Sequence, residues 1–312
     1  MEKLENRKIV LVKRRTRLDE LIARFNSISQ ARFYIEHLGA DFSDYEKEHS
    51  EYLLAIQEAT AILGQITRLH VLERAYLPNF LFAPDDVVVA IGQDGMVANT
   101  LKYLSGQPCL GVNPAPDRWD GVLLPFLVRD LKCVVPEVMR GARQFREVSM
   151  AAAALNDGQT LLAVNDLFIG QKTHISARYT LTYDGKSEQQ SSSGIIVSTG
   201  LGSTGWMKSI LTGADGVVQS LSGKPQREVP GKSFDCSADY LYYSVREPFP
   251  SKTTGTTLIF GKITGSRQLT ILSQMAENGV IFSDGIESDF LQFNSGMEAV
   301  VSVAGIKGIL VV

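Results

Sequence analysis

The sequence contains few of the residues that build disulfide frameworks and metal centres. Its 312 residues include only three cysteines, Cys109, Cys133 and Cys236, which are widely spaced and form no C-x-x-C pair. The four histidines show no metal-ligand spacing. These absences argue against a disulfide-stapled scaffold and a cysteine–histidine zinc site, and they favour a reducing compartment.

The chain also lacks an excess of positive charge and long apolar runs. Its 31 basic and 34 acidic residues give a net charge of −3, so no global basic field exists to hold nucleic acid or an anionic membrane. The longest apolar runs, such as Val87–Ile91, fall far short of the roughly 20 residues that a membrane span requires. A strand-like run within nine residues of the start leaves no space for a secretory or transit signal. We therefore expect a cytoplasmic protein that meets any anionic ligand locally.

The composition is that of an ordinary globular protein, with 44% hydrophobic and 21% charged residues. The chain is long enough for one large domain or two smaller ones. Residues 9–12 form a short β-branched run. The apolar residues that follow recur at 3- and 4-residue spacing, which predicts one helical face: Leu18, Leu21, Ile22, Phe25 and Ile28. A second helix is predicted from Ser43, with Glu46 completing a capping box, to Gly64.

The rest of the first half continues this alternation. Residues 66–72 form a possible strand, and residues 86–91 form the clearest one, because they are apolar on both faces as a central parallel strand must be. This strand runs directly into Gly92-Gln93-Asp94-Gly95, after which residues 96–104 are predicted to be helical. A further strand follows at residues 109–112. The βαβαβ order predicts a parallel sheet wrapped by helices.

The second half has the period-2 pattern of antiparallel sheet. Residues 175–183 alternate apolar and polar side chains and end in the turn Asp184-Gly185. Further short strands are predicted at residues 194–198, 240–245, 257–260, 269–272, 280–282 and 300–303, and residues 187–193 are interpreted as a polar hairpin loop. The expected division is an α/β domain over residues 1–136 and a β-rich domain over residues 137–312, whose last segment packs back on the first domain.

The loop Gly92-Gln93-Asp94-Gly95 is the first candidate for chemistry. A helix N-terminus at the carboxyl end of a parallel strand offers free amides and a positive dipole to phosphate, and the glycines allow close approach. Asp94 would then hold a magnesium ion or accept a proton from a hydroxyl. The alternative is that Asp94 only caps the following helix.

A second candidate is the G-x-G-x-x-G run from Gly200 to Gly205. A dinucleotide-binding Rossmann site is disfavoured here, because the run follows an antiparallel hairpin and Gly213 is expected to interrupt its helix. A phosphate- or ribose-contacting loop with the hydroxyls of Ser203 and Thr204 is better supported. Trp206 is interpreted as part of the core or of a pocket wall.

The pair Asn165-Asp166 follows the apolar strand at residues 161–164. An amide beside a carboxylate can bind adjacent sugar hydroxyls, since Asn donates and accepts while Asp only accepts. The alternative interpretation of this pair is a simple turn. Neither a Walker A sequence nor the protein-kinase motif set is present.

The order of these motifs resembles the NAD kinase family over nearly the whole chain, and more closely its mitochondrial type. The segments that carry the resemblance are Gly92–Gly95, Gly111–Gly121, Asn165-Asp166, Ser193–Trp206, Arg246-Glu247-Pro248 and Asp284-Gly285. It implies a Rossmann-like parallel sheet in an α/β N-terminal domain, a mostly-β C-terminal domain, and an active site between them. The implied reaction moves the γ-phosphate of ATP to the 2′-hydroxyl of the adenosine ribose of NAD.

The resemblance also implies site residues and partners. Asp94 matches the essential aspartate of the family, and Asn165 and Asp166 match its Asn-Glu pair. The residues expected to contact ATP or NAD are Gly92, Gln93, Gly95, Asn113, Asn165, Asp166, Ser193, Thr199, Gly202, Ser203, Thr204, Gly205 and Trp206. The resemblance further implies Mg²⁺ or another divalent cation bound with ATP, no dedicated protein metal site, and a homo-oligomer, either dimer or tetramer.

Four positions depart from the family pattern. Gln93 stands where the family has its second glycine, and Met96 replaces a threonine. Asp166 is one methylene shorter than the family glutamate, and Ser193 replaces an aspartate of bacterial relatives, a change shared with the mitochondrial type. Two alternatives therefore stay open: a catalytically impaired NAD(P)- or nucleotide-binding protein, and a lipid or small-alcohol kinase that uses the same loop.

Overall fold

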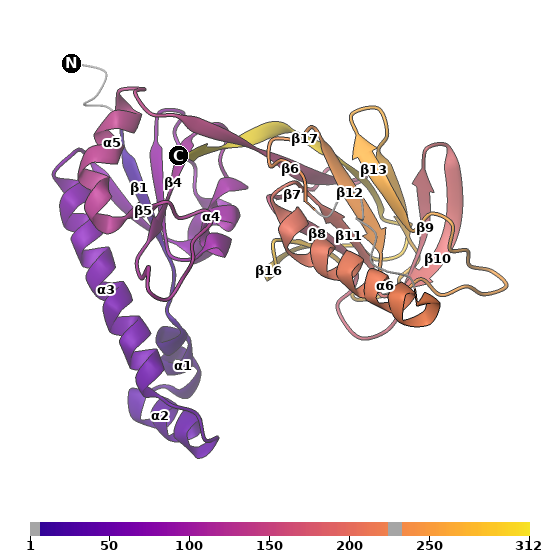
Figure 1. Cartoon of the computed structure of the whole chain (residues 1–312), viewed down its shortest axis with the longest axis horizontal. Coiled ribbons are helices and arrows are strands. Elements are labelled where there is room, and N and C mark those ends of the chain that lie inside the picture. The colour runs from indigo at the N-terminus through magenta and orange to yellow at the C-terminus, as the bar shows by residue number, and fades with distance from the viewer. Residues whose placement is uncertain (1–6, 224–232) are drawn as a thin grey trace. The chain divides into compact units, whose positions relative to one another are not determined.

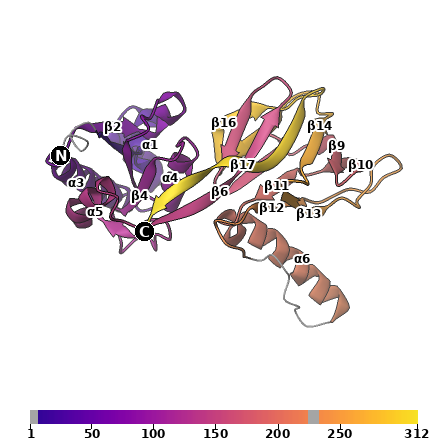
Figure 2. The same ribbon diagram turned by 90° about the horizontal axis from the view of Figure 1, so that it is seen from above.

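The computed structural model describes residues 7–223 and 233–312, and the chain divides into two compact units (Figure 1). Unit 1 comprises Met1–Arg146 and Ile309–Val312, and unit 2 comprises Glu147–Gly308. The chain passes from one unit to the other within β6 (Phe145–Leu155) and returns within β17 (Glu298–Val311), two strands that pair with each other (Figure 2). The division expected after residue 136 falls inside helix α5 (Leu131–Met139), whose Val134, Val135 and Val138 are buried in the core of unit 1.

Unit 1 contains the parallel sheet that the sequence predicts. Its strands lie in the order β4-β3-β1-β2, and the short β5 and the end of β17 also pair with β4 in parallel. Their bounds are β1 (Ile9–Lys13), β2 (Leu69–Glu73), β3 (Val87–Ile91), β4 (Pro108–Asn113) and β5 (Phe126–Leu127). Every residue of β3 is buried, as expected of a central parallel strand. One face of the sheet packs against α3 (Ser43–Gly64) and α5, and helix α4 (Asp94–Leu101) follows β3 (Figure 1).

The single helical face predicted for residues 18–28 is wrong. Helix α1 (Arg17–Phe25) ends at Asn26, which has φ 63°, and α2 (Ile28–His37) begins after Ser27, whose hydroxyl accepts a hydrogen bond from the Gln30 amide. Asn tolerates this left-handed conformation and Ser is a favoured N-cap, so the two residues separate the helices. Ile28 therefore starts a new helix and is 48% exposed.

The capping box predicted at Ser43 is also absent. Helix α3 does start at Ser43 and end at Gly64, but its N-cap is Phe42 and no side chain caps it. The Ser43 hydroxyl donates to Asp41, and Glu46 forms an ion pair with Arg32. Because Ser43 and Glu46 bind these other side chains, α3 has the predicted bounds but not the predicted capping box.

Unit 2 is built from antiparallel sheet. One sheet has six strands in the order β13-β12-β11-β8-β15-β16, and the part of the larger sheet within unit 2 runs β10-β9-β14-β17, with β6 beside β17 and β7 beside β6. The bounds are β7 (Thr160–Ala163), β8 (Asp166–Gln171), β9 (Ala177–Tyr183), β10 (Lys186–Ser192), β11 (Ile195–Ser198), β12 (Tyr240–Val245), β13 (Phe260–Thr264), β14 (Leu269–Ser273), β15 (Gly279–Ser283) and β16 (Ile286–Gln292).

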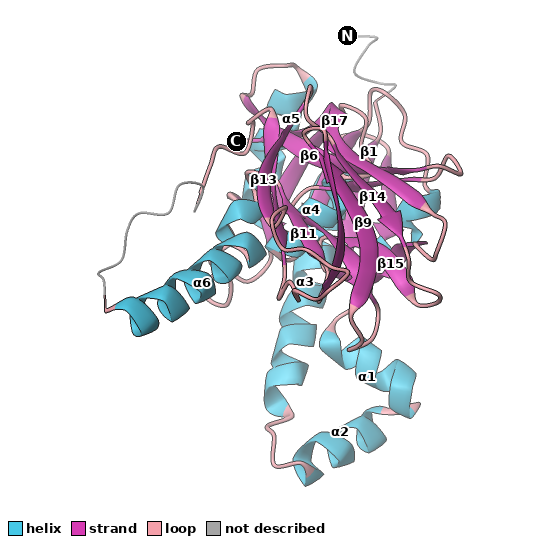
Figure 3. Cartoon of the chain, turned by 90° about the vertical axis from the view of Figure 1, so that its right-hand side faces the viewer, coloured by secondary structure: helices cyan, strands magenta, loops and turns pink. Residues whose placement is uncertain are grey.

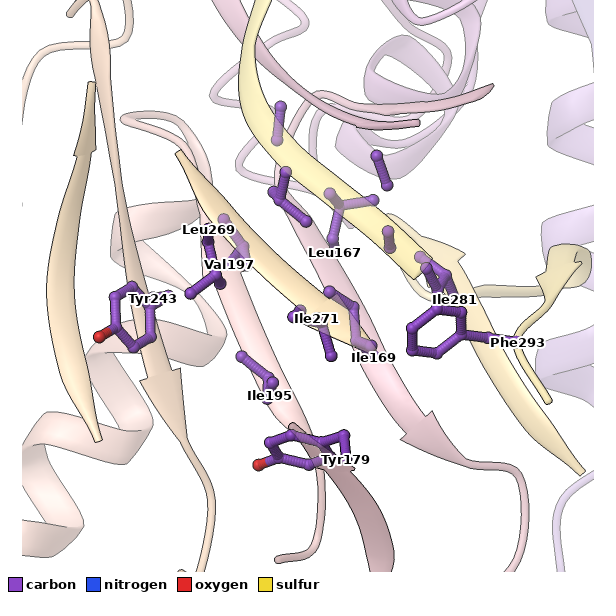
Figure 4. Packing of buried hydrophobic residues seen from close by; sticks show 14 of the residues in the cluster. Leu167, Ile169, Tyr179, Ile195, Val197, Tyr243, Leu269, Ile271, Ile281 and Phe293 are labelled. Atoms are coloured by element: carbon purple, nitrogen blue, oxygen red, sulfur yellow. The ribbon is translucent and has the colours of Figure 1, made fainter. Parts of the chain in front are cut away.

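The two sheets of unit 2 enclose one hydrophobic core. Leu167, Ile195 and Val197 come from the six-stranded sheet, while Leu269 and Ile271 come from β14 of the other, and all five are fully buried (Figure 4). Helix α6 (Trp206–Ser222) contacts the six-stranded sheet through a second apolar cluster (Figure 3). This arrangement confirms an α/β domain followed by a mostly-β domain.

Two predictions in unit 2 need correction. Residues 186–192 form strand β10 rather than a loop, because the left-handed turn Asp184-Gly185 brings them back along β9 in full register. Ser192 is buried there and hydrogen-bonds the Tyr179 hydroxyl at 2.7 Å, which explains why a polar segment forms a strand. The strand expected at residues 257–260 instead spans Phe260–Thr264.

Candidate active site

The loop Gly92-Gln93-Asp94-Gly95 lies at the carboxyl end of β3. Gln93 is the N-cap of α4, with extended backbone and no side-chain capping bond, and its carbonyl accepts a hydrogen bond from the Met96 amide at 2.8 Å. Asp94 is the first residue of the helix, so it does not act as the cap. The N-terminus of α4 therefore presents backbone amides and a positive dipole at the end of a buried parallel strand.

The Asp94 carboxylate is held in place by a neighbouring loop. Its Oδ1 accepts a hydrogen bond from the Leu123 amide at 2.7 Å, while Oδ2 has no partner among the residues that the structure describes. One oxygen of this half-buried carboxylate thus fixes the side chain, and the other can accept a proton.

The loop that holds Asp94 is organised by Asn113, at the end of β4. The Asn113 Oδ1 accepts from the Ala115 amide at 3.0 Å, and its Nδ2 donates to the Trp119 carbonyl at 2.9 Å. Gly111 is required beneath this loop, because a Cβ there would lie 1.8 Å from the Leu123 carbonyl oxygen. Both the oxygen and the nitrogen of the Asn113 side-chain amide therefore hydrogen-bond backbone groups of this loop.

A cluster of residues that the sequence analysis did not single out supports the same edge of the sheet. The Tyr52 hydroxyl donates to the Ile91 carbonyl and accepts from the Arg14 amide, each at 3.0 Å, so it joins the ends of β3 and β1. Burial raises the pKa of Tyr52 to about 12. Arg14 donates to Glu48 at 2.8 Å, and its Nε is buried without a hydrogen-bond partner, close to Gly92. Arg14 is therefore a cation beside the glycine loop with an unused donor.

The ion pairs around Arg14 continue to the loop after β4. Glu48 also binds Arg17, and Asp44 binds both Arg17 and Arg118. Burial acts to raise the pKa of Glu48, but hydrogen bonds from Arg14 and Arg17 outweigh it and hold that pKa below its usual value. Hydrogen bonds from Arg118 and Arg17 lower the pKa of Asp44 to about 2. Three arginines thus share these two carboxylates.

In unit 2, one carboxylate organises the segment that contains Asn165 and Asp166. Asp284 accepts hydrogen bonds from the backbone amides of Val164 at 3.1 Å, Asn165 at 2.6 Å and Asp166 at 3.3 Å. The sequence signal for this role is the Asp284-Gly285 turn, which was part of the motif order without being assigned a site function. Asp284 is therefore the residue that shapes this segment.

The Asp166 carboxyl occupies a confined position. Burial, reinforced by the nearby charge of Asp284 and opposed by a hydrogen bond from Ser198, raises the pKa of Asp166 to about 7. Its Oδ1 has no hydrogen-bond partner among the described residues and would lie 2.8 Å from a Cβ at Gly202. A side chain at residue 202 would therefore crowd the Asp166 carboxyl, which glycine avoids.

The glycine-rich loop packs directly on the Asn165 segment. The Thr199 hydroxyl donates to the Val164 carbonyl at 2.5 Å, the Thr199 amide donates to the Asn165 carbonyl at 3.0 Å, and Gly202 lies so close to that carbonyl that a Cβ would approach it to 2.2 Å. Ser203 donates to the Gly200 carbonyl at 2.6 Å. The fold thus brings the second and third sequence candidates together within unit 2.

The strands around this loop argue against a dinucleotide-binding Rossmann site. Strand β11 pairs antiparallel with both β8 and β12, so the loop does not open a βαβ unit. The expectation that Gly213 interrupts the following helix is wrong: α6 is continuous from Trp206 to Ser222. Both helical glycines, Gly213 and Gly216, have open space where a Cβ would be, so neither marks a break.

The remaining candidates do not all lie together: Thr204, Gly205 and Trp206 continue the glycine-rich loop, whereas Ser193 lies at the opposite end of β11, where its amide donates to the Arg246 carbonyl. Thr204, Gly205 and Ser193 are exposed, and Trp206 starts α6 with its ring stacked on Phe168. The described residues contain no group of three His, Cys, Asp or Glu that could hold a metal ion, and none of their helices is both long and apolar enough for a membrane span.

Comparison with known proteins shows which fold this is. No family model and no curated protein matches the sequence. Among solved structures, the chain is similar to an NAD kinase from Archaeoglobus fulgidus in complex with ATP, with a TM-score of 0.57, 16% identity, and 97% of this chain and 92% of that chain covered. It is also similar to yeast NADH kinase complexed with NADH, with a TM-score of 0.53, 15% identity, and 97% and 83% covered.

At these identities the likeness concerns the fold, and it gives no support for the mitochondrial type in particular. The order of the motifs and the presence of an α/β unit and a mostly-β unit agree with it. The chain has the two-domain fold of the NAD kinases.

Proposed function

We propose that this protein is an NAD kinase, which transfers the γ-phosphate of ATP to the 2′-hydroxyl of the adenosine ribose of NAD. The observation that carries the proposal is Asp94, a carboxylate fixed by one oxygen at the N-terminus of α4 and at the carboxyl end of β3. It stands in a fold shared with one kinase solved with ATP and another solved with NADH.

Phosphoryl transfer requires alignment, neutralisation of charge and acceptance of the hydroxyl proton. In unit 1, the amides at the start of α4 and the guanidinium of Arg14 would bind phosphate oxygens, since both are donors beside Gly92. The free Oδ2 of Asp94 would accept the proton of the ribose hydroxyl. In unit 2, the Asn165 amide and the Asp166 carboxyl would bind the hydroxyls of NAD.

In this scheme Mg²⁺ would be bound together with ATP. Magnesium keeps several waters and is often bound through one or two carboxylates together with substrate phosphates. Asp94 is the residue of this loop that could contribute such an oxygen. The ion would neutralise phosphate charge, and the chain itself would need no further ligands.

One observation favours a second candidate, a nucleotide-binding protein without turnover. Gln93 brings a side chain to the loop where the family has only glycine, and that side chain makes no capping bond. A lipid or small-alcohol kinase would not need the Asn165-Asp166 segment that Asp284 organises.

Incubation of the purified protein with Mg²⁺-ATP and NAD separates these candidates. We expect ADP and NADP to form together, the latter read out with an NADP-specific dehydrogenase. NAD binding by calorimetry without turnover would select the nucleotide-binding protein. ADP formation that depends on a lipid or small alcohol, with no dependence on NAD, would select the other kinase class.

The role of Gln93 is tested by Gln93→Gly. We expect kcat to stay within about threefold of wild type or to rise, because the side chain holds no capping bond and glycine is itself accepted at an N-cap at a cost of a few tenths of a kcal/mol. Steady-state kinetics with ATP varied provide the measurement. A large fall in activity with a raised KM for ATP would show instead that the Gln93 amide contacts the nucleotide.

The role of Asp166 is tested through pH. With a pKa of about 7, the ionised share of this carboxyl rises from about one tenth at pH 6 to about nine tenths at pH 8. Only the ionised form accepts hydrogen bonds with both oxygens. We therefore expect the KM for NAD to fall about tenfold over this range, with kcat changing less.

Asp166→Ala should abolish that pH dependence. We expect kcat/KM for NAD at pH 8 to drop by about 10- to 150-fold through KM, the scale of a charge-assisted hydrogen bond, and KM to be flat from pH 6 to 8. Asp157→Ala, which removes an exposed carboxylate of the same unit, is the matched control and should behave as wild type. An unchanged KM in Asp166→Ala would remove this residue from the substrate site.

A further inference from the structure

A polar pocket lies on the outer face of the β9–β10 hairpin in unit 2. Its volume is about 390 Å³, within the range of about 300–1,000 Å³ that is usual for small-molecule sites. Phe249 is its one apolar lining residue, and none of the described residues that line it is acidic. No residue of the candidate active site takes part in the lining. The pocket is therefore a separate feature of unit 2.

Strand alternation places three polar side chains side by side in this pocket. Tyr179 and Leu181 of β9 point into the core of unit 2, so Arg178 points to the opposite face of the sheet. Ser191 of β10 pairs directly with Arg178, and Gln189, two residues before Ser191, shares its face. Because residues that oppose each other in antiparallel strands have Cβ atoms about 4.5–5.5 Å apart, these side chains form one continuous wall.

The polar groups of this wall are not used within the chain. The side chains of Arg178, Gln189 and Ser191 form no hydrogen bond or ion pair with any residue that the structure describes. Gln274, whose amide donates to the Arg178 carbonyl at 2.9 Å, uses only its side-chain nitrogen, which donates to the Thr180 hydroxyl at 3.1 Å. The pocket thus offers one guanidinium, which binds oxyanions in bidentate geometry, beside neutral groups that both donate and accept.

The loop between β12 and β13 forms the other wall and is held in place. The Phe249 amide donates to the Ser191 carbonyl at 2.8 Å, and the Gly255 amide donates to the Gln189 carbonyl at 2.9 Å, so the loop runs along β10, the outermost strand of its sheet (Figure 2). The Ser251 hydroxyl accepts hydrogen bonds from two amides of the loop, at 3.2 and 3.1 Å. Protection of a sheet edge explains the backbone hydrogen bonds, but it requires neither a pocket nor an arginine without a partner. A wall that is ordered in advance lowers the cost of binding a ligand.

We propose that this pocket binds a small anion that carries hydroxyl groups, either a phosphorylated sugar or a sugar acid. Arg178 would bind the phosphate or carboxylate, and Gln189 and Ser191 would bind the hydroxyls. The inference goes beyond the proposed function, because the lining residues are distinct from the candidate active site and binding here involves no phosphoryl transfer.

Calorimetry with the full chain, in the absence of ATP and NAD, provides the test. Glucose 6-phosphate and gluconate serve as probes, and at least one of them should bind with a Kd below about 1 mM, the affinity expected of a ligand of this size. Glucose, which lacks the charge, and inorganic phosphate, which lacks the sugar hydroxyls, should each bind at least about tenfold more weakly. The tighter of the two probes identifies the anionic group as phosphate or carboxylate.

Two variants assign the binding to this pocket. Arg178→Gln should weaken the tighter probe at least about tenfold, and Gln189→Ala should weaken it about two- to tenfold, the scales of a charge-assisted and a neutral hydrogen bond. The matched controls in unit 2 are Arg267→Gln, which removes an arginine of an exposed ion pair, and Gln159→Ala, which removes an exposed glutamine bonded to Asp157. Both controls should bind the probe as the wild-type protein does.

Several outcomes would overturn the proposal. They are a lack of saturable binding of both probes, equal effects of the pocket and control variants, inorganic phosphate that binds as tightly as the sugar probe, and displacement of the probe by NAD or ATP, which would place it in the candidate active site. Gln189→Ala decides the assignment if circular dichroism shows that Arg178→Gln does not fold. A protein that binds the probe here but makes no NADP would retain this inference and lose the proposed function.

Discussion

Asp94→Asn should lower kcat for NADP formation by at least about 10²-fold, the usual scale for removing a general base, while the protein stays folded. The reason is specific to this carboxylate. The amide oxygen of asparagine can still accept the Leu123 hydrogen bond that positions the loop, but the amide cannot take a proton from the ribose hydroxyl. The substitution therefore removes the base and keeps the structure around it.

Asp130 supplies a matched control for this experiment. Its Oδ2 accepts a hydrogen bond from the Leu127 amide at 2.8 Å, the same kind of contact in the same unit, at the start of another helical segment. Asp130→Asn should leave kcat near the wild-type value, and ATP binding by calorimetry should be similar in both variants. An Asp94→Asn enzyme that turns over normally would reduce Asp94 to a residue that only holds the loop.

Asp284→Ala should lower the free energy of unfolding by about 2–4 kcal/mol and raise the KM for NAD more than tenfold. The substitution leaves the amides of Val164, Asn165 and Asp166 without their shared acceptor, and hydrogen bonds to a charged group contribute about 1.5–3 kcal/mol each without full additivity. Urea denaturation and steady-state kinetics measure the two effects.

Asp184→Ala separates these hydrogen bonds from the cost of the turn itself. Asp184 and Asp284 both have left-handed backbone, with φ of 50° and 55°, and both precede a glycine. The Asp184 carboxylate, however, only faces Arg267 in an exposed ion pair, which is worth up to about 1 kcal/mol. Equal destabilisation by the two variants would mean that the turn, and not the three amides, accounts for the effect of Asp284.

The parts of the fold that the sequence predicts are those encoded by local pattern. Residues 87–91 are apolar throughout and form a central strand, and the Asp184-Gly185 turn forms the hairpin. Local sequence pattern predicts the wrong secondary structure where contacts between distant residues or a single backbone conformation determine it. Strand β10 is polar, yet it pairs with β9 along its whole length, and its buried Ser192 hydrogen-bonds the Tyr179 hydroxyl. Asn26 separates α1 from α2, although the spacing of the apolar residues predicts a single helix there.

Prediction of the candidate site from local sequence has the same limit: it misses contacts between distant residues. The motifs identify Asp94, Asn165 and Asp166 from short runs of sequence, but the residues that position them lie far away in the chain. Asp284 reaches amides 118 to 120 positions earlier, and no local pattern relates the two segments. Such partners are set by the packing of sheets, which a single sequence does not display.

The identity of the phosphorylated product tests the central claim most directly. The protein should be incubated with Mg²⁺-ATP and NAD, and the products followed by ³¹P nuclear magnetic resonance together with an NADP-specific dehydrogenase. The account predicts one 2′-phosphorylated NAD for each ADP formed, and neither product above background with Asp94→Asn. ADP without NADP, or no reaction in the presence of bound ATP and NAD, would contradict it.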